Sequence, residues 1–222
     1  RSVMTFVSTH YDHRLVFMRL SRLLTKPLTT LVSVFLLLAG NANSATLLVL
    51  GDSLSAGYGI DPDKGWVNLM RADVGPQHTI INASISGDTS GNGLDRLPML
   101  LEKFKPDIVL LELGGNDGLR GYPLSLLKGN LTEMIALCRT HNATPILFGM
   151  RLPANYGKRY TAGFAELFPA LAEQHDIGLV PFEFEALLQT EGMIQADGIH
   201  PTEPAQPILK QAVLAQLKAL LP

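Results

Sequence analysis

A serine, an aspartate and a histidine in this sequence could together perform acyl transfer. Ser53 follows the apolar run 47–50 in the stretch LLVLGDSLSAGYG, so a strand is expected to end just before it. Serine is a weak nucleophile at neutral pH and needs a neighbouring base. His200, in DGIHP, is the candidate base, and Asp197 stands three residues before it. Within a turn, this spacing lets the carboxylate accept the Nδ1 proton and leaves Nε2 free to take the proton of Ser53.

The pair of Asp197 and His200 is a weak signal when it is taken alone. Gly198 permits a tight bend and Pro201 prevents helix continuation, so the same residues would also suit a polar loop that caps the next helix. The remaining histidines are expected to be solvated or to lie outside the folded domain: His10, His13, His78, His141 and His175. His200 is therefore the histidine on which a catalytic hypothesis depends.

Acyl transfer also requires hydrogen-bond donors for the negative oxygen of the intermediate. Gly87, in ISGDTS, could offer its backbone N–H with no side chain in the way, and Asn116, in GGND, could offer its amide. Each residue could instead serve a turn or a helix cap. The order of the segments favours the chemical interpretation, because each follows a predicted strand.

The elements that must position these residues form an alternating pattern of short apolar runs and longer segments of helical period. This alternation predicts an α/β fold with a five-stranded, flavodoxin-like parallel sheet between two layers of helices, a three-layer α/β/α domain. Strands are expected at 46–50, 79–83, 107–113, 144–149 and 178–182. Helices are expected near 65–73, 93–104, 124–141, 161–175 and 205–221. Ligands of such folds bind outside the carboxyl ends of the strands, which is where the candidate residues would lie.

The N-terminal part of the chain is predicted to be an export signal. Three basic residues precede the uncharged apolar run 28–39, and small polar residues follow this run. The run is long enough for the hydrophobic part of a signal peptide and too short to cross a membrane. We therefore expect a cleaved signal peptide from Met18 to about Ala45, with an uncleaved anchor as the alternative. Residues 1–17 would be upstream sequence, and 46–222 a single periplasmic or secreted domain.

Charge and cysteine content restrict the possible partners. The chain has 18 basic and 20 acidic residues, of which five and one lie in residues 1–45, so the mature part is about six charges negative. This balance disfavours nucleic acid and anionic lipid surfaces as partners. Cys138 is the only cysteine, so neither an internal disulfide nor a cysteine metal cluster is possible. The small size of the chain, with no apolar helical stripe left over, predicts a monomer.

Four ordered blocks resemble those of the SGNH, or GDSL-type, hydrolases: GDSLSAGYG, SISGDTSGNG, LELGGNDGLRG and DGIHP. The resemblance covers residues 46–222, and the stretch RLPANYG makes the chain similar to the bacterial periplasmic multifunctional thioesterase/protease/lysophospholipase subgroup. Ser55 stands where the G-x-S-x-G motif has its second glycine, which argues against an ordinary α/β-hydrolase.

The resemblance implies a role for each candidate residue. Ser53 would be the nucleophile, and its backbone N–H would be one oxyanion donor. Gly87 and Asn116 would be the other two donors. His200 would be the base, oriented by Asp197, and no metal would take part.

The resemblance implies a broad range of substrates. The resemblance implies hydrolysis of acyl thioesters and carboxylic esters, lysophospholipids included, through an acyl-enzyme. The segment 114–123 (GGNDGLRGYP) is rich in glycine and proline, which predicts a mobile lid. Four apolar or aromatic residues are candidates for an acyl groove, although simple packing would also explain them: Leu119, Tyr122, Leu152 and Tyr156.

Two other functions remain open at this point. A carbohydrate acetylesterase of the same family would use the same catalytic set with a small polar pocket. A nonenzymatic flavodoxin-like protein could use SGDTSGNG to bind phosphate, although the sequence has neither a P-loop Gly-Lys-Ser/Thr nor a G-x-G-x-x-G motif.

Overall fold

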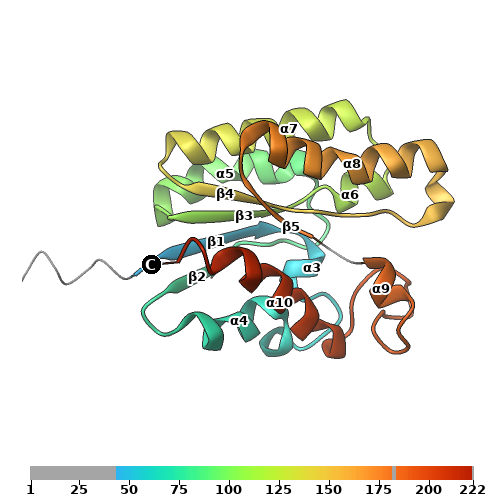
Figure 1. The fold of residues 1–222 in the computed structure, drawn as a ribbon, viewed down its shortest axis with the longest axis horizontal. Helices are drawn as coiled ribbons and strands as arrows, with labels where there is room; N and C mark the ends of the chain where they lie inside the picture. Colours follow the sequence, from blue (N-terminus) through green and yellow to red (C-terminus); the bar gives the residue numbers. More distant parts are fainter. Residues whose placement is uncertain (1–43, 182–183, 222) are drawn as a thin grey trace, which may run out of the picture. The chain divides into compact units, whose positions relative to one another are not determined.

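The computed structural model describes residues 44–181 and 184–221, and nearly all of the predicted signal peptide lies outside this part. Five parallel strands form one sheet in the order β2-β1-β3-β4-β5 (Figure 1). The strands are β1 Thr46–Gly51, β2 Thr79–Asn82, β3 Ile108–Glu112, β4 Thr144–Phe148 and β5 Gly178–Val180. This arrangement confirms the predicted five-stranded parallel sheet.

The central strands β1 and β3 are buried along almost their whole length. They pair with each other, and their outer edges pair with β2 and β4. Continuous apolar sequence suits strands that are covered by helices on both faces. Strand β5 ends two residues earlier than the sequence predicts, because Pro181 has no N–H with which to continue the ladder.

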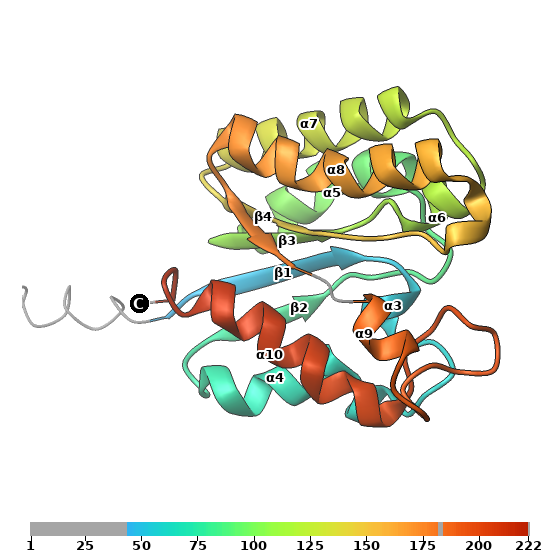
Figure 2. The ribbon, with the colours of Figure 1, turned by 45° about the vertical axis from the view of Figure 1, so that its right-hand side comes forward.

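Helices cover both faces of the sheet. Helices α5, α7 and α8 lie on one side, and α4 and α10 lie on the other (Figure 1, Figure 2). Their bounds are α4 Trp66–Val74, α5 Ser90–Phe104, α7 Leu124–Thr140, α8 Lys158–His175 and α10 Gln206–Leu217. Helix α5 begins three residues earlier than predicted, because Thr89 and Asn92 form a capping box that satisfies its first backbone donors. The three-layer α/β/α fold is thus confirmed.

The shorter elements gather at the edge of the sheet where the strands end. They include α3 Ser53–Ala56, α6 Gly115–Leu119 and α9 Phe184–Leu188 (Figure 1). Three 3-10 helices complete the chain's described part: η2 Pro62–Lys64, η3 Ala154–Tyr156 and η4 Glu203–Ala205. Because α3 follows β1 and α6 follows β3, the two short helices bring Ser53 and Asn116 to one edge. Among residues 44–181 and 184–221, no helix has the length and apolar character needed to cross a membrane.

Candidate active site

Ser53 is the first residue of α3 and lies directly beyond the end of β1. Asp52 caps this helix, because its Oδ1 accepts a hydrogen bond of 3.1 Å from the Leu54 N–H. A side chain at Gly51 would place its Cβ 2.4 Å from Oε2 of Glu112, so only glycine fits at this crossing. The strand end, the cap and this glycine together present the Ser53 hydroxyl at the edge of the sheet.

The structure brings Ser53, His200 and Asp197 into one chain of contacts. His200 Nε2 lies 2.8 Å from Ser53 Oγ, and His200 Nδ1 lies 2.6 Å from Asp197 Oδ2. The other Asp197 oxygen accepts hydrogen bonds from the backbone N–H groups of Ile199 and His200, at 2.9 and 3.0 Å. Slight burial opposes ionisation of Asp197, but the hydrogen bonds from His200 and Ile199 outweigh it and lower the pKa of Asp197 to about 2.

A short stretch of antiparallel pairing holds the turn that carries these two residues. Ile194 bridges to Pro201, and the Gln195 N–H donates to the His200 carbonyl at 2.8 Å. The ring of Tyr58 lies against the imidazole, with the ring centroids 4.6 Å apart. The orientation of His200 is thus fixed from its backbone and from one face of its ring.

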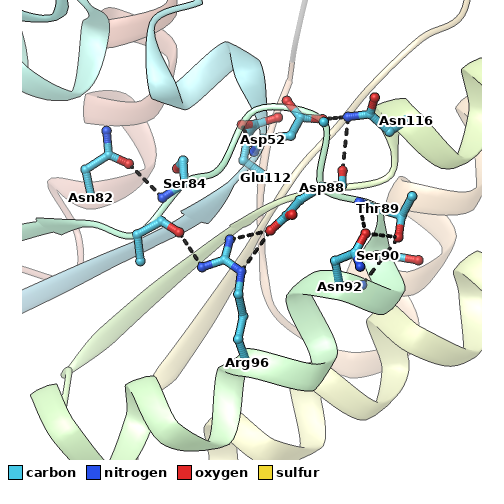
Figure 3. Close-up of polar contacts among 12 residues, drawn as sticks. Asp52, Asn82, Ser84, Asp88, Thr89, Ser90, Asn92, Arg96, Glu112 and Asn116 are labelled. Atoms are coloured by element: carbon cyan, nitrogen blue, oxygen red, sulfur yellow. Dashed lines mark hydrogen bonds and ion pairs between the residues drawn. The ribbon is translucent and has the colours of Figure 1, made fainter.

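The two other candidate donors lie on loops that contact each other. Gly87 has a φ of +87° and is exposed, with no atom within 4 Å of the place where a Cβ would stand. Within the described chain, its N–H has no acceptor. The Asn116 amide nitrogen lies 3.0 Å from both Asp52 Oδ2 and the Asp88 carbonyl (Figure 3). Both Asn116 amide hydrogens are therefore engaged, and an oxyanion would have to share or replace one of these acceptors.

Two residues that the sequence does not single out support this region. Asp117 is buried and accepts from the N–H and the hydroxyl of Ser90, at 2.7 and 2.5 Å, which ties α6 to the start of α5. Glu112 is fully buried at the end of β3, where its Oε2 accepts from the Asp52 N–H at 3.1 Å and from Ser55 Oγ at 2.6 Å. The available signal for Glu112 is a single acid within an otherwise apolar strand.

Burial controls the ionisation of the acids beneath Ser53. Burial raises the pKa of Asp52 to about 6, although hydrogen bonds from Leu54 and Asn116 oppose the rise. Burial, and then the charge of Asp52, raise the pKa of Glu112 well above its ordinary value of 4.5. The raised pKa favours the protonated form of Glu112, and a hydrogen bond with the Glu112 side chain opposes the rise in the pKa of Asp52.

A mainly apolar cavity of about 90 Å³ opens beside Ser53 and His200. Of the four residues predicted for an acyl groove, Leu119 and Leu152 line this cavity, whereas Tyr122 and Tyr156 do not. Tyr122 lies beyond the end of α6, where its side chain is exposed and its carbonyl accepts from the Tyr160 hydroxyl, and Tyr156 belongs to η3. The apolar lining that the sequence does not predict comprises Leu54, Met150, Pro153 and Ile199.

The described residues offer no cluster of three or more His, Cys, Asp or Glu side chains suited to a metal ion. Cys138 is buried in α7, and burial raises the pKa of its thiol to about 12, so it is a poor nucleophile. The chemistry available at this edge of the sheet is that of serine, imidazole and carboxylate.

Comparison with known proteins finds relatives along most of the described chain. The family model described as the GDSL-like Lipase/Acylhydrolase family matches residues 49–206. The esterase TesA of Pseudomonas aeruginosa is 49% identical over 188 residues, which cover 83% of this chain and 94% of the relative. Thioesterase 1/protease 1/lysophospholipase L1 of Escherichia coli strain K12 is 44% identical over 180 residues, which cover 81% of this chain and 86% of the relative.

A solved structure also superposes on the described fold. The psychrotrophic esterase EstA from Pseudoalteromonas sp., in a structure inhibited by monoethylphosphonate, has a TM-score of 0.74 and 39% sequence identity. The match covers 80% of this chain and 98% of that one.

Proposed function

This chain belongs to the GDSL-like lipase/acylhydrolase family of hydrolases, and we propose that it is a serine esterase and thioesterase with Ser53 as nucleophile. The observation that carries the proposal is the chain of short contacts from Ser53 Oγ through the His200 ring to Asp197, at 2.8 and 2.6 Å. The same contacts give each of the three groups its role.

In the first step, Ser53 Oγ attacks the acyl carbonyl carbon while His200 Nε2 takes the hydroxyl proton. Asp197 holds the imidazole with Nδ1 protonated and stabilises the positive charge that forms on it. When the tetrahedral intermediate collapses, the bond to the thiol or alcohol breaks and His200 returns the proton to this leaving group. A water molecule then repeats the sequence on the acyl-enzyme, releasing the carboxylic acid and regenerating Ser53.

The negative oxygen of each intermediate needs donors at the helix start and on the neighbouring loops. The Ser53 N–H belongs to the unpaired first turn of α3, and the Gly87 N–H is exposed and has no acceptor within the described chain. Asn116 would turn one amide hydrogen from Asp52 or Asp88 toward the oxyanion. Donors of this kind act most strongly on charge that develops during the reaction.

The lining of the cavity supports an acyl chain over a carbohydrate acetyl group. Six of its residues are apolar: Leu54, Leu119, Met150, Leu152, Pro153 and Ile199. We propose acyl thioesters, carboxylic esters and lysophospholipids as substrates. The printed name of the E. coli relative, which combines thioesterase and lysophospholipase, supports this range.

The proposed cellular location is based on the sequence pattern of the N-terminal part. We propose that the residues from Met18 to about Ala45 are a cleaved signal peptide and that the mature enzyme is a periplasmic or secreted monomer. The basic residues before the apolar run and the small residues after it support this proposal.

The deciding experiment compares wild type, Ser53→Ala and Ser125→Ala across acyl-thioester and lysophospholipid chain-length series. Ser125 is an exposed serine of α7 and provides the same chemical change away from the site. We expect Ser53→Ala to lose about four orders of magnitude in kcat or more, and Ser125→Ala to match wild type. A serine-directed phosphonate should label wild type at Ser53. A folded Ser53→Ala protein with normal hydrolysis would refute the proposal.

A further inference from the structure

Arg96 of α5 holds both ends of the loop that carries Gly87. Its Nη1 donates to the carbonyl of Ala83, just after β2. Its Nε donates to Asp88 Oδ2 at 2.8 Å, and its Nη2 lies 2.8 Å from the same oxygen. Figure 3 shows the side chain pointing from the helix to Asp88. The two anchor points therefore lie immediately before and after residues 84–87.

The loop between these anchors has little apolar packing of its own. Ile85 is 51% exposed, and Gly87 is exposed with open space around its Cα. Its other contacts are polar: the Ile85 N–H donates to the Gly51 carbonyl at 3.0 Å, and the Gly87 carbonyl accepts from exposed Arg120 at 3.1 Å. A loop with so few buried apolar contacts depends on hydrogen bonds and charge for its conformation.

Asp88 connects this anchor to the second candidate donor. Its carboxylate receives Arg96, and its carbonyl accepts from the Asn116 amide at 3.0 Å. The side chains of Arg96 and Asp88 are only 18% and 14% exposed. Solvent therefore screens their ion pair less than it screens an ion pair on the surface. The planar guanidinium can bond a carbonyl and a carboxylate at once, which a lysine ammonium on a flexible stem does less well.

We propose that Arg96 is a positioning residue for the oxyanion hole. By fixing Ala83 and Asp88, it sets the direction of the Gly87 N–H and places the acceptor that holds Asn116 beside Ser53. Arg96 does not line the cavity and acts only through these groups. The inference rests on the proposed function, because it assigns Gly87 and Asn116 to the developing oxyanion. A shift of about 1 Å in such a group can cost about 100-fold in rate.

The test compares Arg96→Met and Arg96→Lys with Lys210→Met. Lys210 is a matched control, because its side chain is 17% exposed, pairs with Asp73 at 2.7 Å, and joins α10 to α4 on the other face of the sheet. We expect Arg96→Met to lower kcat about 30- to 100-fold with KM changed less than about threefold. Arg96→Lys should recover part of this loss, since it can still pair with Asp88. Lys210→Met should keep the wild-type kcat.

Two further readouts distinguish positioning from a general loss of structure. The affinity for an aryl trifluoromethyl ketone, whose adduct with Ser53 places an oxyanion in the hole, should fall in parallel with kcat/KM. The midpoint of the acid limb of the pH profile should not move, because the polar contacts of Arg96 are with Asp88 and Ala83 and not with the Ser53, His200 and Asp197 side chains. A wild-type kcat in folded Arg96→Met, or a loss confined to the melting temperature or KM, would overturn the inference.

A third variant keeps the inference testable if Arg96→Met does not fold. Asp88→Asn retains an oxygen for Arg96 but removes the charge, and it should show a smaller loss of kcat with the same unchanged KM. If Asp88→Asn retains wild-type kcat and ketone affinity, the inference is wrong. Absence of Ser53-dependent hydrolysis in wild type would instead overturn the proposed function on which it rests.

Discussion

Carboxyl groups flank Ser53 on two sides, and their surroundings differ. Asp197 lies in the turn before His200, where its side chain is 37% exposed and accepts three hydrogen bonds. These bonds lower the pKa of Asp197 to about 2 despite slight burial. Asp52 and Glu112 lie beneath α3, where burial raises the pKa of Asp52 to about 6 and raises that of Glu112 well above its ordinary value of 4.5.

This difference shows that environment, rather than distance along the chain from the serine, decides which acid can serve the histidine. Asp52 is the immediate neighbour of Ser53, yet its oxygens bond the Leu54 N–H and the Asn116 amide. Asp197 is far away in sequence and carries a secure negative charge at the imidazole. Under the proposed function, two acids with opposite shifts of pKa would take different roles at one serine.

The largest expected effect comes from Asp197→Asn. An asparagine can hold the ring but favours the wrong imidazole tautomer, so kcat should fall about 10⁴-fold. Asp95→Asn on the exposed surface of α5 is the matched control and should leave kcat unchanged. Steady-state hydrolysis of a thioester measures both variants. If Asp197→Asn retained most of the wild-type kcat, Asp197 would not be the acid that orients His200.

A smaller effect is expected from Asp52→Asn. The new amide has one oxygen in place of two, so it can cap α3 or accept from Asn116, but not both. We expect kcat to fall about tenfold, corresponding to the loss of one hydrogen bond to a charged group. Kinetics and thermal unfolding of the same preparation separate the catalytic loss from the loss of the cap. A decrease as large as that of Asp197→Asn would remove the distinction between the two acids.

The sequence predicts the position of the exposed acid, Asp197, better than it predicts the contacts of the buried acids, Asp52 and Glu112. Asp197 and His200 are close in the chain, and the turn that joins them is a local feature that the stretch DGIHP can indicate. The five strands also carry local signals in their apolar runs. The contacts of Glu112 with Asp52 and Ser55 depend on the register of β1 against β3, which no local pattern reveals.

Arg96 and the aromatic groove candidates illustrate the same limit. In sequence, Arg96 is an ordinary charged residue of an amphipathic helix, and its contacts with Ala83 and Asp88 arise only when α5 packs beside the end of β2. Tyr122 and Tyr156 have suitable types for a groove, but the directions of the turns after α6 and β4 decide what lines the cavity. Residue type therefore identifies candidates for a groove, but it does not predict the direction in which their side chains point.

The smallest expected effect on activity comes from Glu112→Gln. Glutamine has the shape of protonated glutamic acid, and it can keep the acceptor for Asp52 and Ser55 while its amide replaces the acid proton toward Asp52. We expect kcat within about threefold of wild type. Glu112→Ala should instead lose substantial stability, because it leaves buried donors without an acceptor. A tenfold loss of kcat in Glu112→Gln would mean that the buried acid works as an anion.

The pH dependence of the free energy of unfolding also tests the protonation of Glu112. Acids with raised and with lowered pKa values change this free energy in opposite directions as the pH rises. A buried acid with a raised pKa keeps a proton that the unfolded chain releases. The free energy of unfolding therefore falls as the pH rises above the ordinary pKa of the acid, which is 4.5 for Glu112 and 3.8 for Asp52. For Asp52, this fall ends near its folded pKa of about 6. Asp197 has the opposite sign, because its contribution is present above 3.8 and is lost as the pH falls toward about 2.

Glu112→Gln removes one of these contributions and leaves the others. Urea unfolding between pH 5 and 8 should therefore show a smaller decline in stability with rising pH than wild type, whereas the curve below pH 4 should keep the loss caused by Asp197. Glu133→Gln, at an exposed position of α7, is the control for removal of an acid and should follow the wild-type slope. An unchanged slope in Glu112→Gln would show that Glu112 is already ionised in the folded protein, and the contrast between the buried and exposed acids would then rest on Asp52 alone.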